Sequence, residues 1–524
     1  MGTFQITYDD FSGGQYMGNK SANLPKNTWT GKNIICAPDG QLMPSQPLEL
    51  SRYQTGLTST FATIADHWII GADSFVFTRW GTTPGSATMT VHSNIYNGTT
   101  APTAPNVFPL TYLGTPLLIL GQVAYAQIPG SGLTGFFFAN LGTIYRIDVP
   151  SGAVTLISSA LSDASNVMLY GYRLFAWSGT RFLYYSDTDM ITWSASQYYE
   201  FNSPVRNVVA RTNDLLVFTD GGVYSVVGVP GSSVTIQLIV PELNIMEGMD
   251  KAVVVNRKAY FLDDSRNSFY FSGRIHVLNG ATVQTAYQIL NSDTVAVSKK
   301  GIAYEIGHFS VAPNGQLALQ LTNGYFYIET TPGQWSRFYS SRNDYTTNTA
   351  SNQQRIGKPG PTAPDELCLV ASISTDSPFS ASDPGLVLTR YLHNIPAIEN
   401  VDTGFSTSLL GATTPTGTVT LSEYWHSKPY TVKEVFVEFF ARTGYTPAIT
   451  VGITPTGIID LYSADNGGAL VEASQPLTVG TANTNNASIT QRYRVNNAAK
   501  GFGATTYLTI TNATIKRVIL NCED

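Results

Sequence analysis

A unit of two apolar strands joined by a tight turn recurs along the middle of this 524-residue chain, from about residue 60 to 395. Each strand-like run is short and ends at Gly, Asn, Asp or Pro, as β-strands and hairpins do. We take five apolar residues as equivalent points of the unit: Phe137, Phe175, Val217, Tyr260 and Leu317. Their spacings of 38, 42, 43 and 57 residues lie near the length of a propeller blade, about 40–50 residues.

A repeat of this kind predicts a β-propeller, because a four-stranded blade cannot bury both of its faces alone and must stack around an axis. We expect six or seven blades, in an all-β molecule with almost no helix. Trp193 and Trp335, with Trp80 as a looser third case, close units in similar contexts and are expected to wedge neighbouring blades together. The competing interpretation is a set of independent β-sandwiches, which have the same short strands.

Three flanking or inserted segments have a different character. Residues 1–55 are rich in Gly, Asn, Pro and Lys without a period, so we expect an extended N-terminal arm that orders on a neighbour; a disordered tail is the alternative. The propeller is assigned to 56–400, with a polar, Pro/Gly-rich insertion at 342–364 expected as an exposed loop. Residues 401–524 carry runs of alternating hydrophobicity and are expected to form a C-terminal β-sandwich or jelly roll.

Composition excludes several classes of protein. Only 13% of the residues are charged and the net charge is −6, against about 25% charged residues in an average domain. The balance argues against a nucleic-acid binder held by phosphate contacts, which needs a surplus of Lys and Arg. The 12% of aromatic residues exclude disorder, and the three cysteines, Cys36, Cys368 and Cys522, exclude a disulfide scaffold.

Targeting signals are not apparent in the sequence. The start lacks a basic region followed by an apolar stretch, so a cleaved signal peptide is not expected. Apolar windows are too short and too interrupted to match the about 18 residues of a membrane span. We therefore expect a protein made and kept in a cytoplasm until it is assembled into something.

Catalytic and metal-binding patterns are missing as well. The histidines lie at least 25 residues apart and give no paired zinc spacing: His67, His92, His276, His308, His393 and His426. Asp66 and His67 are neighbours on a strand, so their side chains point to opposite faces and make a poor dyad. Nucleophile elbow, phosphate loop and CxxC motifs are absent. The sequence thus nominates no catalytic, cofactor-binding or metal-binding residue, and no cofactor.

One near motif concerns glycosidases, which often use propellers. The stretch Ser186–Trp193 (SDTDMITW) resembles the Asp-box turn of sialidases, S-x-D-x-G-x-T-W, in its Ser, Thr and Trp. Thr188 stands where the motif has Asp, and Met190 stands where it has Gly. Asp boxes are structural turns, so this resemblance favours blade topology rather than activity.

Two further functions remain as alternatives. A propeller glycosidase or depolymerase needs two carboxylates that face each other across a cleft, and the first pairs to test are Asp187 with Asp189 and Asp263 with Asp264. A glycan-binding, receptor-recognition protein would use exposed aromatic platforms in the C-terminal unit. The candidates are Tyr424, Trp425 and Tyr430, with core packing as the competing role.

Three stretches together resemble a known family. The start ITYDDFSGGQYMGNKSANLPKNTW resembles the F-x-G-G opening of virion proteins of tailed bacteriophages. The stretch PVRNVVARTNDLLVFTDGGVYSVVGVPGS (204–232) resembles the blade of those proteins, and KPYTVKEVFVEFFAR (428–442) is similar to their passage from propeller to C-terminal sandwich. The family is that of tail nozzle or tail-hub proteins of short-tailed double-stranded DNA phages.

This resemblance implies a non-enzymatic role in the virion tail. Such proteins form a ring, commonly a hexamer, below the head-to-tail adaptor and around the DNA exit channel. The partners implied are copies of the chain, the adaptor, and other tail proteins or fibres, and the family has no catalytic residues to carry over. A slightly acidic conduit is expected to let double-stranded DNA pass without specific binding, since tight binding needs Lys and Arg.

Overall fold

The structure is a computed structural model of the chain. It describes residues 2–13, 27–32, 34–36, 40–44, 49–54, 61–71, 73–81, 88–93, 106–148, 151–161, 163–228, 230, 232–243, 245, 250–264, 271–288, 307–311, 315, 317–321, 326–331, 334–338, 354–363, 367–373, 385–391, 416–441, 447–458, 469–473, 488–495, 500–511 and 513–524. These residues form β-strands and turns, and they include no helix long and apolar enough to span a bilayer.

Five four-stranded antiparallel sheets are each built from one continuous segment of the chain. The first contains β12 (Ala124–Gln127), β13 (Thr134–Asn140), β14 (Thr143–Asp148) and β15 (Val154–Ser158). The second contains β16 (Asn166–Tyr170), β17 (Arg173–Trp177), β18 (Phe182–Ser186) and β19 (Trp193–Glu200). The third contains β20 (Val205–Ala210), β21 (Leu215–Thr219), β22 (Gly222–Gly228) and β23 (Val234–Pro241). The fourth contains β24 (Ala252–Val255), β25 (Lys258–Asp264), β26 (Phe271–Asn279) and β27 (Thr282–Gln288). The fifth contains β28 (Gly307–Val311), β29 (Leu317–Leu321), β30 (Phe326–Thr331) and β31 (Gln334–Phe338).

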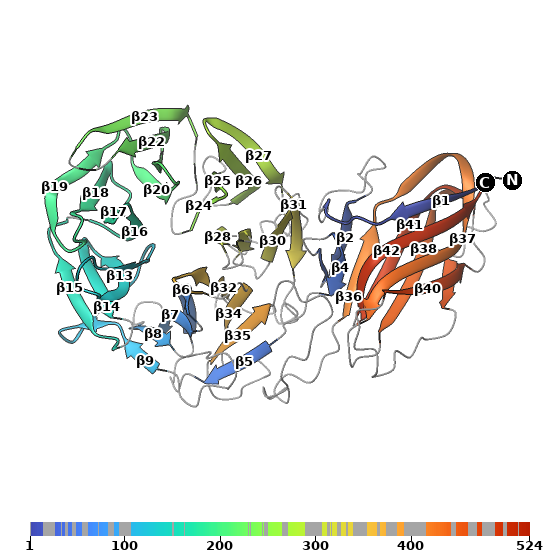
Figure 1. Cartoon of the computed structure of the whole chain (residues 1–524), viewed down its shortest axis with the longest axis horizontal. Helices are drawn as coiled ribbons and strands as arrows, with labels where there is room; N and C mark the ends of the chain where they lie inside the picture. The colour runs from blue at the N-terminus through green and yellow to red at the C-terminus, as the bar shows by residue number, and fades with distance from the viewer. Residues whose placement is uncertain are drawn as a thin grey trace.

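Two more sheets combine segments that are far apart in the sequence and complete the circle (Figure 1). One contains β32 (Gln354–Ile356), β34 (Leu367–Ile373), β35 (Gly385–Tyr391) and β5 (Glu49–Gln54). The other contains β33 (Lys358–Pro359), β6 (Phe61–Ile70), β7 (Asp73–Gly81), β8 (Thr88–Ser93) and β9 (Asn106–Pro109). A small hairpin of β10 (Thr111–Tyr112) and β11 (Thr115–Pro116) follows β9. The arrangement is a β-propeller, which confirms the predicted fold class.

The predicted repeat corresponds to real blades. The five equivalent points lie on the second strand of the five continuous sheets, that is on β13, β17, β21, β25 and β29: Phe137, Phe175, Val217, Tyr260 and Leu317. The Leu141-Gly142 turn joins β13 to β14, with φ values of 49° and 84°. This is the doubly left-handed geometry that matches the twist of a two-residue hairpin.

The cores of the propeller lie between neighbouring sheets. Phe137 of the first sheet packs in one cluster with Leu174 and Trp193 of the second. Phe218 of the third sheet and Phe261 of the fourth have ring centroids 5.4 Å apart. A blade therefore buries each face against a neighbour, as the repeat predicted. Trp193 takes the predicted wedging position, while the side chains of Trp80 and Trp335 lie outside the described residues.

The C-terminal unit is a network of eleven strands in the part of the chain that the structure describes. Its C-terminal members are β36 (Thr416–Leu421), β37 (Tyr424–Ala441), β38 (Ala448–Ile458), β39 (Ala469–Ala473), β40 (Ser488–Val495), β41 (Gly501–Thr511) and β42 (Ala513–Glu523). Its N-terminal members are β1 (Thr3–Tyr8), β2 (Trp29–Lys32), β3 (Ile34–Cys36) and β4 (Leu42–Pro44). Figure 1 shows this unit beside the propeller, with the two chain ends next to each other.

The expectation of an extended N-terminal arm is corrected by these pairings. β1 pairs antiparallel with β42 over its whole length, and β5 is the outer strand of a propeller sheet. Tyr8 and Phe11 are buried, the Tyr8 hydroxyl donates to the Ser422 carbonyl at 2.9 Å, and Trp29 Nε1 donates to the Phe11 carbonyl at 3.0 Å. The apolar anchors of this segment thus find their core within the same chain, and residues 14–26, 33, 37–39, 45–48 and 55 lie outside the description.

The predicted exposed loop at 342–364 is also corrected in part. Residues 342–353 and 364 lie outside the described residues, but 354–356 form β32 and 358–359 form β33. β33 pairs in parallel with β6, through Lys358 opposite Trp68 and Pro359 opposite Ile69. These strands could not be predicted because they are only three and two residues long and lie in a polar, Pro/Gly-rich segment.

Candidate functional site

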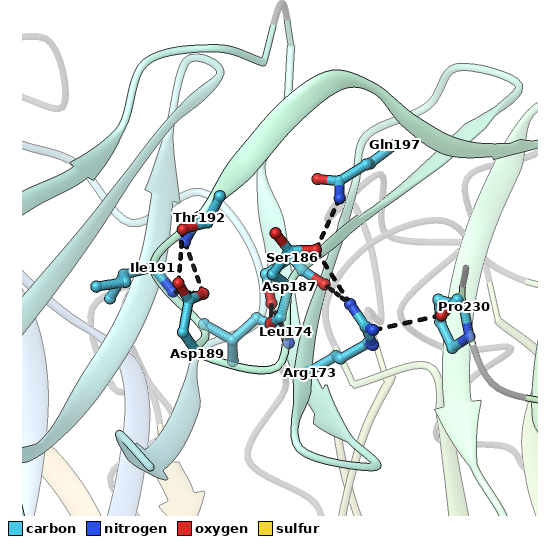
Figure 2. Close-up of polar contacts among 9 residues, drawn as sticks. All are labelled: Arg173, Leu174, Ser186, Asp187, Asp189, Ile191, Thr192, Gln197 and Pro230. Atoms are coloured by element: carbon cyan, nitrogen blue, oxygen red, sulfur yellow. Dashed lines mark hydrogen bonds and ion pairs between the residues drawn. The ribbon is translucent and has the colours of Figure 1, made fainter. Parts of the chain in front are cut away.

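The turn between β18 and β19 is the best defined of the predicted features, and its polar contacts are drawn in Figure 2. Its backbone closes on itself, since Asp187 N donates to the Thr192 carbonyl at 2.9 Å and Met190 N donates to the Asp187 carbonyl at 3.0 Å. Ser186 Oγ accepts from Leu174 N at 2.9 Å and donates to the Asp187 carbonyl at 2.8 Å. The resemblance to an Asp box therefore extends to a compact turn at the end of a blade.

Asp189 supplies the carboxylate that holds this turn. Its Oδ1 accepts from Ile191 N at 3.0 Å and Thr192 N at 2.9 Å, and its Oδ2 accepts from Thr192 Oγ1 at 2.6 Å. Partial burial acts to raise the pKa of Asp189, but the hydrogen bonds from Thr192 and Ile191 outweigh it and lower the pKa. The carboxylate that closes the turn thus comes from one position after the place where the motif has Asp.

Asp187 points the other way and belongs to an ion pair (Figure 2). Its Oδ1 accepts from Gln197 Nε2 at 2.8 Å and lies 3.5 Å from Arg173 Nη1. The same guanidinium donates from Nη1 to the Ser186 carbonyl at 2.7 Å and from Nη2 to the Pro230 carbonyl at 3.3 Å. Arg173 therefore connects the turn of the second sheet to the loop that precedes β23 in the third.

Met190 occupies the glycine position of the motif in a left-handed conformation, with a φ of 62°. Its side chain is 2% exposed and packs in the core between the first two sheets, in the same cluster as Trp193. A left-handed non-Gly residue is uncommon because its Cβ crowds the backbone. Here the burial of a large side chain compensates for that conformation.

The two carboxylates of this turn do not form the facing pair of a glycosidase. The oxygens of Asp189 are occupied by groups of its own turn, and Asp187 is paired with Arg173 and Gln197. The two carboxyl groups of a glycosidase flank the scissile bond, whereas Asp187 and Asp189 are bonded to groups on opposite sides of the turn (Figure 2). The second pair to test, Asp263 and Asp264, has its side chains outside the described residues.

The histidines are dispersed. His67 is buried on β6 and its backbone N donates to Asp66 Oδ1 at 2.9 Å. His276 stacks on Phe261, and the ring of His426 stacks on another aromatic ring in the C-terminal unit. His308 is half-buried on β28, the side chain of His92 is not described, and neither is His393. Among the described residues, no group of three or more His, Cys, Asp or Glu side chains could hold a metal ion.

The aromatic platform residues divide between core and surface. Tyr430 is buried and donates its hydroxyl to the Tyr424 carbonyl at 2.9 Å, and the ring of Tyr424 packs against the same core. Trp425 is 43% exposed and pairs with Gly503 of β41. Core packing therefore accounts for the two tyrosines, and only Trp425 of the three presents a large surface to solvent.

A buried ion cluster joins β33 to β6 and to Asp250, just before β24, and it was missed by sequence reasoning. Lys358 Nζ lies 2.8 Å from Asp250 Oδ1 and 3.1 Å from Asp66 Oδ1. Trp68 Nε1 donates to Asp66 Oδ2 at 3.0 Å. The three charged residues are separated by more than 100 positions in the sequence, so no local motif could have indicated them.

Burial and mutual attraction oppose each other in this cluster. Burial raises the pKa of Asp66, which the Lys358 ammonium only partly offsets. Burial also acts to lower the pKa of Lys358, but the carboxylates of Asp250 and Asp66 outweigh it and raise the pKa. The ammonium is therefore held charged, and two carboxylates share its single positive charge.

Comparison with known proteins gives no family: no family model and no curated protein matches the chain. Among solved structures it is similar to the one described as "YCF48 bound to D1 peptide", at 10% identity and a TM-score of 0.38, covering 66% of this chain and 98% of that one. PorZ, an essential bacterial surface component of the type-IX secretion system of Porphyromonas gingivalis, gives 12% identity and a TM-score of 0.38, covering 73% and 44%. Apo AztD from Citrobacter koseri gives 10% identity and a TM-score of 0.38, covering 70% and 97%. These similarities are too low to carry an argument about function.

Proposed function

We propose that this chain is a non-enzymatic structural protein of a bacteriophage virion. In this proposal it assembles with copies of itself, as a hexamer, into a tail nozzle or hub below the head-to-tail adaptor, and the ring lines or gates the DNA exit channel. The proposal combines the resemblance of three sequence stretches with the surface of the propeller. The observation that carries the assembly part is a set of large apolar side chains exposed at hairpin tips.

Three hairpin tips present these side chains to solvent. Leu113, Leu141 and Tyr172 are 88%, 77% and 75% exposed, and their φ values are 47°, 49° and 60°. Such positions in hairpins are normally taken by Asn, Asp or Gly, which tolerate left-handed conformations and water. A large apolar residue at such a position has an unfavourable backbone conformation and also exposes apolar surface to water. Contact with another subunit would remove the exposure.

The polar groups that could be interpreted as catalytic have structural contacts, which supports a non-enzymatic role. The carboxylates of the turn at Ser186–Trp193 are used to hold the blade, as described above. Lys358, Asp66 and Asp250 pair with one another in a buried cluster beside β6, an inner strand of the propeller. We therefore place the DNA conduit of this proposal in the hole between subunits of the ring, and not along the axis of one propeller.

Assembly through these tips is testable with variants that improve the local fold. Leu113→Asn, Leu141→Asn and Tyr172→Asn each place the preferred residue in a left-handed hairpin position. We expect the triple variant to keep or raise the thermal midpoint of the subunit while native mass spectrometry shows loss of the wild-type oligomer. A matched control is Leu169→Asn, which alters a 39% exposed apolar residue within β16 rather than at a tip.

Two outcomes would contradict the proposal. One is a wild-type chain that stays monomeric at micromolar concentration, alone and with adaptor, and that cleaves a labelled polysaccharide, as the depolymerase alternative requires. The other concerns the conduit: a free ring that binds double-stranded DNA tightly, with an affinity that falls steeply with salt, would contradict passage without specific binding.

A further inference from the structure

The segment 354–363 runs along the edges of two propeller sheets, because β32 is the edge strand of its own sheet and β33 is the edge strand beside β6. The innermost strands β6, β24, β28 and β32 surround the centre of the propeller in Figure 1, and β33 lies against β6. β33 and β6 pair in parallel, whereas the other strand pairs in the described part of the chain are antiparallel. A two-residue parallel strand added to the inner edge of a sheet is a strap on that sheet, not a member of a meander.

Close backbone contacts fit this strap to the end of β6. Gly360 N donates to the Ile69 carbonyl at 2.7 Å, and Gly71 N donates to the Pro361 carbonyl at 3.0 Å. A Cβ at Gly357 would lie 2.5 Å from the Ile69 side chain, and a Cβ at Gly360 would lie 2.6 Å from Ile70 Cγ1. Glycine at both positions therefore permits an approach that a side chain would block.

Lys358 joins the strap to two different parts of the ring. Its side chain is 14% exposed, and those of Asp66 and Asp250 are 1% and 6% exposed. Asp66 belongs to β6, while the Asp250 carbonyl accepts from Phe309 N of β28 at 2.7 Å. The ammonium thus connects the sheet of β6 with the junction between β24 and β28.

We propose that residues 357–363, which follow β32, form a strap on the inner edge of β6, and that Lys358 locks it through Asp66 and Asp250. The strap is held at one end by backbone hydrogen bonds to β6 and at the other by the ion cluster. Without the cluster the strap leaves the edge of β6, and the blades, whose cores lie between sheets, stay folded. This device does not depend on the proposed role in a virion.

A variant without the three charges distinguishes an ionic lock on the strap from a general contribution of these residues to packing. The triple variant Asp66→Asn, Asp250→Asn, Lys358→Met removes the ion bridges without leaving an unpaired buried charge, a change that is often close to neutral for global stability. We expect its unfolding midpoint to stay near that of the wild type. Hydrogen exchange at the Gly71 and Gly360 amides is expected to become at least about tenfold faster, with exchange in 166–200 unchanged, because local opening is independent of the blades.

Further variants complete the experiment. Lys358→Met alone leaves two buried carboxylates unpaired, so we expect a lowered unfolding midpoint as well as fast exchange of the strap. Lys433→Met is the control, since Lys433 pairs with Glu523 on the surface and is 53% exposed; it should change neither readout. The proposal is overturned if the strap amides of the triple variant exchange at the wild-type rate, or if exchange increases equally across 166–200.

Discussion

Replacement of Met190 tests the interpretation of the Ser186–Trp193 turn quantitatively. Met190 is 2% exposed in the core between the first two sheets and has a φ of 62°. Truncation of a buried Met to Ala costs about 2–5 kcal/mol. Both Met190→Ala and Met190→Gly lose this packing, so restoring the glycine of the Asp-box motif is expected to destabilise the protein.

The informative quantity is which of the two variants has the higher free energy of unfolding. A left-handed conformation costs a non-Gly residue about 1–2 kcal/mol, and Gly loses about 0.5–1 kcal/mol more than Ala in conformational freedom on folding. The difference leaves Met190→Gly more stable than Met190→Ala by up to about 1.5 kcal/mol. At an ordinary strand position the order is the opposite.

Urea denaturation followed by tryptophan fluorescence measures this difference, because Trp193 packs in the same cluster. Met168 is the matched control: it is 6% exposed on β16, and without a left-handed conformation its Ala variant should be the more stable. A Met190→Ala variant as stable as Met190→Gly, or more stable, would refute the compensation between backbone conformation and burial.

Three further predictions concern other parts of the chain. Hydrogen bonds from Lys516, Ser488 and Arg517 lower the pKa of Glu438 from an ordinary value of 4.5 to about 2. The contribution of Glu438 to the free energy of unfolding is therefore full above about pH 4.5 and is lost as the pH falls toward 2. An acid titration of the Glu438→Gln variant should lack this loss of stability. Phe11→Ala removes a fully buried side chain and should lower the free energy of unfolding of the monomer by about 3–5 kcal/mol in urea; no effect in the monomer would favour an arm that orders only on a neighbour. Asp189→Asn should cost about 1 kcal/mol in thermal unfolding, and a gain in stability would contradict the hydrogen bonding of the turn.

The propeller could be predicted from the sequence because its strands pair with near neighbours. A meander needs only local signals, namely alternating apolar residues, a tight turn and a return strand, and these recur with the blade length. The turn at Ser186–Trp193 was found for the same reason, since all its members lie within eight residues. The motif was interpreted as a structural turn, but the sequence did not indicate that Asp189, rather than position 188, provides its carboxylate.

The remaining features depend on contacts between distant segments. β1 pairs with β42 across almost the whole chain, and β5 pairs with β35, which follows it by more than 300 residues. Local periodicity contains no information on such partners, so a segment of short strands was interpreted as an arm. The Lys358 cluster also depends on distant segments. In the sequence each of its three charged residues resembles an ordinary surface residue, and only the folded propeller brings them together.

The low charge of the chain, 13% of its residues, and the exposed apolar hairpin tips are both accounted for if subunits cover one another. Electron microscopy of the purified particle at micromolar concentration tests this central claim most directly. Our account predicts a ring of identical subunits, six-fold, with a central hole between them and with the hairpin tips at subunit contacts. A population of single propellers with free hairpin tips, at concentrations where the protein cleaves a polysaccharide, would contradict it.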